Sequence, residues 1–263
     1  MIAVTPLAAM LISLKALRRD RGGLQFLGSF MRTIFYIDGF NLYQSRLKRN
    51  RGYRWLNLLT LARRLVADDE TVMRVNFYTA YVAGRVDADA VGKQQAYLVA
   101  LKTVPEIHIE SGNFVISDRW VRLVHPPAAR PDGCPWPEPH PHFVKASIPQ
   151  EKGSDVKLGV HLVRDSFQDA YDVAYVLTND SDLEEPIRIA AQELEKRVVI
   201  VPPILPRSPQ APVPAPSLRR VASGVCFIQD EDLREAQFPD EVVREGRSTL
   251  MRPPGWSSTR YDD

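Results

Sequence analysis

The sequence predicts a three-layer α/β/α sandwich with a mainly parallel central sheet. Segments of β-branched and aromatic residues alternate with segments whose apolar residues recur at helical spacing, which is typical of α/β folds. Residues 172–178 are almost continuously apolar, as a central parallel strand covered on both faces requires. Acidic residues follow two of the predicted strands directly, and ligands of α/β sheets bind at such strand ends.

The individual elements follow from local patterns. Residues 33–38 predict the first strand, because a run of β-branched and aromatic residues ends there at an acid and a glycine. Apolar residues recur every three or four positions through residues 55–66, which predicts an amphipathic helix. By the same criteria we predict strands at 71–82, 106–110, 172–178 and 197–201, helices at 41–48, 88–103, 154–167 and 183–194, and a hairpin or edge pair at 114–124.

Proline-rich segments suggest how the domain is delimited. Residues 1–32 are expected to be a peripheral extension, and Met31, just before the first strand, is an alternative start. The α/β domain is predicted to span residues 33–201, with a proline-rich loop at 125–150. Residues 202–216 contain seven prolines and predict a linker. Residues 217–263 are expected to pack on the domain and then to end in a loose tail.

Composition excludes several classes of protein. The net charge of +2 produces no strong global field, so any nucleic-acid site must be a local patch. Cys134 and Cys226 lie far apart in the sequence, which fits a reducing cytoplasm better than a disulfide framework. No apolar run approaches the roughly 20 residues of a membrane span. We therefore expect a cytoplasmic protein without a membrane segment, and a homo-oligomer is compatible with this composition.

Four aspartates are candidates for a common site. Asp38 closes the first strand, Asp155 opens a helix, and Asp180 and Asp182 follow the strand at 172–178. If both strands are central, the four carboxylates meet at one edge of the sheet and repel one another unless a cation is present. Oxygen ligands without nearby histidine or thiolate select Mg²⁺ or Mn²⁺, whose coordination a phosphate oxygen typically completes. This combination points to phosphodiester chemistry.

Each acidic motif also has a structural interpretation. An aspartate before a glycine is common in turns, and Asp155 is a candidate helix cap. Asp180-Ser181-Asp182 is compatible with a cap or with a nucleotide-sugar or phosphate transferase. No glycine-rich phosphate loop follows the first strand, which disfavours the transferase. It is the joint occurrence of the motifs, in this order, that favours a metal site.

Three segments resemble the motifs of NYN domains, a family of PIN-like ribonucleases. Tyr-Ile-Asp-Gly-Phe-Asn-Leu-Tyr at 36–43 looks like the opening motif, Glu-Lys-Gly-Ser-Asp-Val-Lys-Leu at 151–158 the second, and Thr-Asn-Asp-Ser-Asp-Leu at 178–183 the third. The similarity spans roughly residues 33–255 and implies a PIN-like fold and Mg²⁺- or Mn²⁺-dependent cleavage of RNA. The implied metal ligands are Asp38, Asp155, Asp180 and Asp182, and the resemblance implies that Asn41 orients Asp38 or a metal-bound water.

Two positions depart from that family pattern. His161 stands where many NYN domains carry a further acid, and Asn179 stands where glycine is frequent. The alternative function is an RNA- or protein-binding module with little turnover, although such a module would be free to lose its mutually repelling acids. RNA is the expected partner, and the candidate phosphate contacts are Lys152, Lys157, Arg188 and Arg46, the last in a basic run that would otherwise be a solvated face.

Overall fold

The structure is a computed structural model that describes residues 30–81, 88–124, 139, 141–204 and 213–256. The chain divides into two compact units, Met1–Phe30 and Met31–Asp263, and every element named below belongs to the second. Along these described ranges no helix has the length and apolar character needed to cross a membrane.

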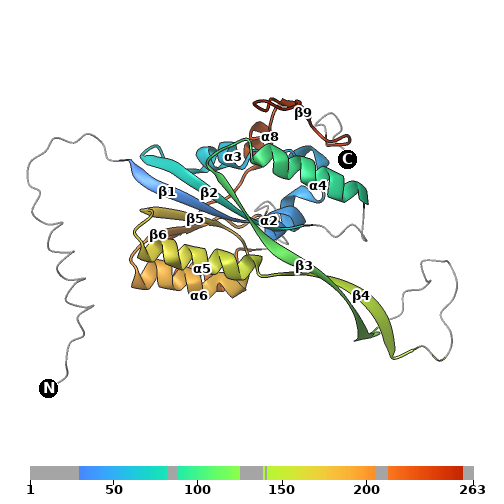
Figure 1. The fold of residues 1–263 in the computed structure, drawn as a ribbon. Coiled ribbons are helices and arrows are strands. Elements are labelled where there is room, and N and C mark those ends of the chain that lie inside the picture. Colours follow the sequence, from blue (N-terminus) through green and yellow to red (C-terminus); the bar gives the residue numbers. More distant parts are fainter. Residues whose placement is uncertain (1–29, 82–87, 125–138, 140, 205–212, 257–263) are drawn as a thin grey trace, which may run out of the picture. The chain divides into compact units, whose positions relative to one another are not determined.

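A seven-stranded sheet lies at the centre of the second unit (Figure 1). Its strands are β1 (Met31–Asp38), β2 (Glu70–Ala80), β3 (Ile107–Arg122), β4 (Phe143–Lys152), β5 (Val173–Leu177), β6 (Arg197–Ile200) and β7 (Gly224–Val225). They are arranged in the order β4-β3-β2-β1-β5-β6-β7. The six strands from β3 to β7 pair in parallel, and β4 pairs antiparallel with β3 at the edge. The mainly parallel sheet predicted from the sequence is therefore confirmed.

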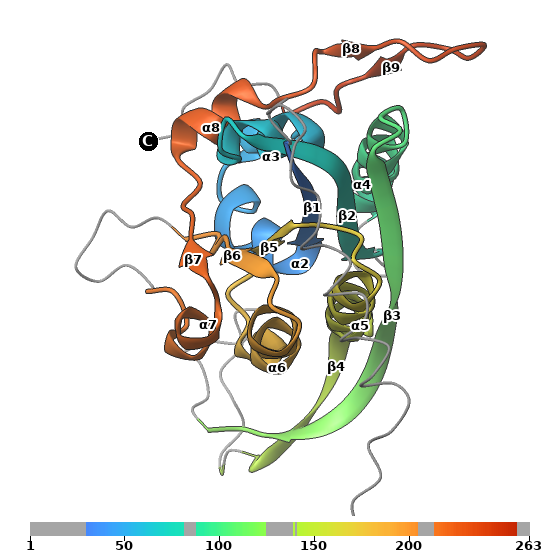
Figure 2. The ribbon, with the colours of Figure 1, turned by 90° about the vertical axis from the view of Figure 1, so that its left-hand side faces the viewer.

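Helices cover both faces of this sheet (Figure 2). Successive side chains of a strand point to opposite faces, so Phe35 and Ile37 of β1 enter one core while Ile34 and Tyr36 enter the other. The helices α3 (Leu58–Leu65), α4 (Ala88–Leu101) and α8 (Asp230–Glu235) pack on the Phe35 side, and α5 (Ser154–Phe167), α6 (Glu184–Arg188) and α7 (Pro216–Val221) pack on the Tyr36 side. The result is the predicted three-layer sandwich.

Two of the predicted helices change their winding along their length. The helix predicted at 41–48 consists of α2 (Gly39–Leu42) and a π-helical segment, η1 (Tyr43–Leu47). The helix predicted at 183–194 consists of the end of a 3₁₀ turn, η3 (Ser181–Leu183), then α6 and a second π-helical segment, η4 (Ile189–Glu193). A further 3₁₀ turn, η2 (Arg51–Tyr53), precedes α3. Helix α5 has the predicted bounds.

The proline-rich segment differs from the prediction. Residues 143–150 of the predicted loop belong to β4, which runs to Lys152 and pairs with residues 113–122 of β3 (Figure 1). One long strand, β3, thus replaces the predicted strand at 106–110 and supplies one member of the predicted edge pair. Pro149 is tolerated because β4 is an edge strand, where a missing backbone N–H can face away from the sheet. Residues 125–138 and 140 lie outside the described residues.

The C-terminal segment belongs to the same fold. β7 extends the sheet beside β6, and α7 already begins at Pro216, inside the predicted linker. Residues 202–204 at the start of that linker are buried, and residues 205–212 lie outside the described range. In place of the loose tail we predicted, β8 (Glu241–Val242) and β9 (Leu250–Met251) pair antiparallel, and Trp256 is buried against Trp55.

Candidate active site

The order of the strands creates a switch point beside β1. β2 and β3 lie on one side of β1, whereas β5, β6 and β7 lie on the other. In such sheets the carboxyl ends of the two strands that flank the reversal form the usual ligand site. Asp38 ends β1, and Thr178 directly follows β5, so the first and third acidic motifs meet at this position.

Hydrogen bonds connect Asp38 with the motif after β5. Asp38 Oδ2 accepts a hydrogen bond from the Thr178 hydroxyl at 3.2 Å, and the same hydroxyl oxygen accepts one from the Asp180 backbone N–H at 3.1 Å. The other carboxylate oxygen, Oδ1, accepts the Asn41 backbone N–H at 2.9 Å and caps α2. Thr178 is fully buried, so it holds Asp38 and Asp180 in fixed positions.

Asn41 joins the two loops by its side chain. Its Oδ1 accepts the Asn179 backbone N–H at 3.3 Å, while its own backbone N–H orients Asp38. Asn179 Oδ1 in turn accepts the Ala215 backbone N–H at 2.8 Å. The asparagine at position 179 therefore has a clear use here, because its side chain connects the third motif to the segment that leads into α7.

Asp155 and Asp182 lie in an adjoining part of the site. Both are exposed, and both line a surface hollow of about 440 Å³ between α5 and the η3–α6 segment. Asp155 Oδ1 accepts the backbone N–H of Val156 at 2.8 Å. The Asp182 backbone N–H donates to Asp180 Oδ1 at 3.1 Å, which links this hollow to the row of hydrogen bonds at the ends of β1 and β5.

The donor atoms suit a hard cation held by few ligands. Among the described residues, no three acidic, histidine or cysteine side chains come close enough together to enclose a metal ion. Mg²⁺ does not need such a cage, because it is usually bound through one or two carboxylates and keeps several waters. Asp38 and Asp180 offer carboxylate oxygens of that kind at the switch point.

His161 has a structural partner within the fold. Its Nδ1 lies 3.0 Å from the Tyr78 hydroxyl, at the contact between α5 and β2. Burial lowers the pKa of His161, and the positive charge of Arg164 acts in the same direction, against the raising effects of Glu110 and Asp165. His161 is thus a hydrogen-bonded residue of the packed interface.

A buried carboxylate lies next to this histidine, on the same helix. Asp165 is 2% exposed and accepts hydrogen bonds from the Tyr36 hydroxyl at 2.8 Å and from Arg164 Nη2 at 2.7 Å. Arg74 also contacts it. The sequence analysis missed both this cluster and the role of Thr178. Only the position of Thr178 at a strand end, as the first residue of the third motif, could have signalled its role.

The structure contradicts the prediction that Arg46 binds RNA. Arg46 is 5% exposed, donates to the Ile228 carbonyl at 2.9 Å and pairs with Asp230 at 2.7 Å. Burial lowers the pKa of its guanidinium against the raising effect of Asp230. The winding of α2 and η1 turns this member of the basic run inward, where it connects the first helix to the segment before α8.

The other three predicted phosphate contacts lie at the surface and differ in whether their side chains already have partners. Arg188 pairs with Glu185 at 2.6 Å and with Glu193 at 2.8 Å, so its charge is already balanced. Lys157 donates to the Ser111 carbonyl at 2.6 Å. Lys152 is exposed at the end of β4, close in sequence to Asp155.

Comparisons with known proteins give one relative along most of the chain. No protein-family model matches the sequence. The chain is 27% identical over 248 residues to a 6-hydroxy-3-succinoylpyridine 3-monooxygenase of Pseudomonas putida, across 86% of this chain and 75% of the relative. A solved structure of a Vibrio parahaemolyticus protein of unknown function is similar with a TM-score of 0.45 and 13% identity, over 79% of this chain and 98% of that one. By its name, the Pseudomonas relative is an enzyme.

Proposed function

We propose that the chain is a divalent-metal-dependent ribonuclease that hydrolyses RNA phosphodiester bonds at the carboxyl ends of β1 and β5. The observation that supports this most is the buried Thr178 hydroxyl, which joins the Asp38 carboxylate to the backbone of Asp180. Acidic residues of two neighbouring strands are thereby kept together at the switch point. Carboxylates that are brought together at one strand-end edge repel each other, and a cation shared between them would remove that cost.

Each residue of the candidate site has a distinct role in this proposal. Asp38 and Asp180 would hold Mg²⁺ or Mn²⁺, which when bound supplies positive charge for the phosphate and a more acidic water. Thr178 and Asn41 fix the carboxylate of Asp38 by hydrogen bonds. Asp155 and Asp182 would extend the acidic surface into the adjoining hollow. Lys152 and Lys157, which flank Asp155 in the second motif, would hold RNA phosphates.

Metal-dependent cleavage of single-stranded RNA tests the proposal. We expect the purified chain to cut labelled RNA with Mn²⁺ or Mg²⁺ and to stop when EDTA is added. Asp38→Asn and Asp180→Asn, which keep the shape of the side chain, should reduce the rate on the order of 100-fold or more. Asp118→Asn is the matched control, because Asp118 pairs with Lys145 on the surface of the β3–β4 pair.

The outcomes separate three explanations. Equal cleavage by wild type and both site variants would contradict the proposal and indicate a contaminating nuclease. RNA binding without metal and without products over long incubation would instead favour the binding module. Circular dichroism of each variant shows whether the overall secondary structure is intact.

A second candidate function comes from the comparison with the Pseudomonas relative. That protein is named a monooxygenase of a substituted pyridine, and the similarity runs over 86% of this chain. A monooxygenase transfers one oxygen atom of O₂ to its substrate and reduces the other to water with two electrons from a reductant. Substrate-dependent oxygen uptake with 6-hydroxy-3-succinoylpyridine and a reduced nicotinamide or flavin would support this function. If the same preparation takes up no oxygen but cleaves RNA in a metal-dependent way, the monooxygenase function is rejected.

A further inference from the structure

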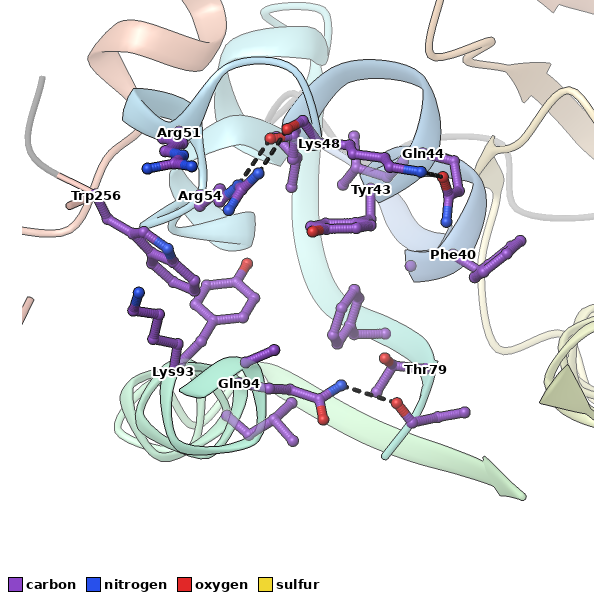
Figure 3. Close-up of a pocket in the computed structure, with 18 of the residues that line it drawn as sticks. Phe40, Tyr43, Gln44, Lys48, Arg51, Arg54, Thr79, Lys93, Gln94 and Trp256 are labelled. Atoms are coloured by element: carbon purple, nitrogen blue, oxygen red, sulfur yellow. Dashed lines mark hydrogen bonds between the residues drawn. The ribbon is translucent and has the colours of Figure 1, made fainter. Parts of the chain in front are cut away.

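A second hollow opens directly beside the candidate active site, on the other side of α2. It has a volume of about 580 Å³ and lies between the α2–η1 segment, the end of β2 and α4 (Figure 3). Its lining begins at Gly39 and Phe40, the two residues that follow Asp38. This volume is within the range of about 300–1,000 Å³ that small-molecule sites occupy.

Aromatic side chains form much of the wall. Tyr97 and Trp256 are buried and pack edge to face with their ring centroids 6.3 Å apart, whereas Phe40 and Tyr43 are 50% and 39% exposed. Phe77, also buried, packs edge to face on Tyr97. Because Phe40 and Tyr43 line the hollow and keep much of their surface exposed, they can offer ring faces to another planar ring.

The rim of the same hollow is basic. Lys48, Arg51 and Arg54 lie along one side and Lys93 lies across from them (Figure 3). The lining contains one carboxylate, Asp89, and it pairs with Lys93 at 2.6 Å. The charges of the other three cations therefore face the hollow without an acidic counterpart in the lining.

These cations differ in how firmly they are held. Arg54 donates to the carbonyls of Leu47 and Lys48 and lies over the Tyr43 ring, 5.5 Å from its centroid. It is therefore a fixed positive charge on an aromatic wall. Lys48 donates to the uncharged Gln44 side chain, and Arg51 is exposed and makes no ion pair with the described residues. Lys48 and Arg51 are thus the cations that can form ion pairs with an anionic ligand.

Two further features mark this hollow. Tyr43, Gln44 and Leu47 reach it from the π-helical segment η1, and such segments often occur at functional sites. The indole N–H of Trp256 is buried and has no hydrogen-bond partner among the described residues. An unpaired buried donor is unfavourable, so an acceptor atom of a ligand would be favoured next to it.

We propose that this hollow binds a planar aromatic ring that carries an anionic group. The ring packs against Tyr43 and the buried aromatic residues, and the anion pairs with Lys48 and Arg51. This proposal goes beyond the ribonuclease function and does not depend on it. Two sources share the chemistry, namely a nucleoside monophosphate and a small aromatic carboxylate.

Calorimetric titration of the full chain distinguishes these sources. The probes are adenosine 5′-monophosphate and pyridine-3-carboxylate, each beside its uncharged counterpart, adenosine or pyridine-3-carboxamide. We expect at least one anionic probe to bind about tenfold more tightly than its uncharged counterpart, as one charge-assisted contact provides. The probe that binds identifies the source of the ring.

Variants separate the ring contact from the charge contact. Arg51→Gln and Lys48→Gln should remove the preference for the anionic probe, whereas Tyr43→Ala should weaken the anionic and uncharged probes alike. Lys145→Gln is the matched control, because it removes the same charge from an exposed position on β4. The proposal is overturned if neither anionic probe binds, or if Arg51→Gln and Lys48→Gln bind as Lys145→Gln does. RNA cleavage is measured separately, so its loss or persistence does not bear on this result.

Discussion

At the scale of single residues, His161 shows how the sheet and α5 determine the charge state of one side chain. The imidazole contacts the Tyr78 hydroxyl, and Arg164 lies in the same electrostatic environment. Protonation would place a second positive charge beside Arg164 and would require solvation that the interface restricts. The folded state therefore favours neutral His161.

The first prediction concerns the pH dependence of stability. The pKa of His161 is lower in the folded chain than the ordinary value of 6.5, so the unfolded chain binds the proton more readily. The contribution of neutral His161 to stability is present above pH 6.5 and is lost as the pH falls through that value toward the folded pKa. His161→Gln should therefore lose less stability than wild type between pH 7 and pH 5.

Urea denaturation at several pH values measures this difference. Above about pH 7.5 the free energies of unfolding of wild type and His161→Gln should run parallel, because neither state of the histidine is then protonated. Curves that stay parallel down to pH 5 would show that the histidine titrates alike in the folded and unfolded chains.

At the scale of elements, close packing of backbone sets where the candidate site lies. A Cβ atom at Gly39 would lie 2.6 Å from the Tyr78 carbonyl oxygen and 2.7 Å from the Phe77 ring. Helix α2 can therefore start directly against β2 only because residue 39 has no side chain. That start determines the position of Asp38, which caps the helix.

The second prediction compares two glycines. Gly39→Ala should destabilise the chain by about 1–3 kcal/mol, because the added methyl group meets backbone and a buried ring. At Gly92 in α4 a Cβ would meet no atom within 4 Å, so Gly92→Ala should stabilise the chain by about 0.5–1 kcal/mol. Thermal denaturation of the two variants checks the pair. A stable Gly39→Ala variant with an unchanged melting temperature would mean that α2 can move away from β2.

The elements also show what sequence patterns could and could not predict. Helix α5 has apolar residues at helical spacing and β5 is an almost continuous apolar run, and both elements were located from these patterns. β4 was predicted as a loop because its neighbours are rich in proline, and its strand depends on pairing with a distant segment of β3. The π-helical winding of η1 and η4 has no local sequence signature. The prediction for Arg46 failed for that reason: its charge indicated an exposed position, but the winding of η1 turns the side chain inward.

At the scale of the whole molecule, the last quarter of the chain completes the core. Trp55 is fully buried and packs against Phe238 and Trp256, with ring centroids 5.8 Å and 6.3 Å away. The Trp55 indole also donates to the Pro239 carbonyl at 2.8 Å. These contacts span most of the sequence, and no local pattern predicts them. The sequence analysis expected this segment to pack on the domain but did not identify its aromatic partners.

The third prediction tests that dependence. Phe238→Ala should destabilise the chain by about 3–5 kcal/mol, because it removes a buried ring and leaves a cavity beside Trp55. Val243→Ala, a few residues further on, changes a side chain that is 80% exposed and should have an effect within about 0.5 kcal/mol. Urea denaturation followed by tryptophan fluorescence measures both. Equal, small effects would show that residues after 230 do not share in cooperative unfolding.

The candidate site is predictable from sequence only in part, for the same physical reason. The sequence predicted that Asp38 and Asp180 lie at or just after strand ends, because strand ends can be located from apolar runs. The basic and aromatic hollow combines η1 and α4 with Trp256, more than 150 residues away from the nearer of them. Such a combination exists only after the C-terminal segment has packed, so it leaves no compact motif.

Helix α2 adjoins both the candidate metal site and the aromatic hollow. Asp38 of the candidate site caps the helix, and the next two residues, Gly39 and Phe40, line the hollow. Both places thus contact the same short helix, which packs closely against β2. If a ligand in the hollow shifts α2, it alters the affinity of Asp38 for a cation by some factor. The cation must then alter the affinity for the ligand by the same factor. Titrating either one in the presence of the other would measure the coupling free energy between the two places.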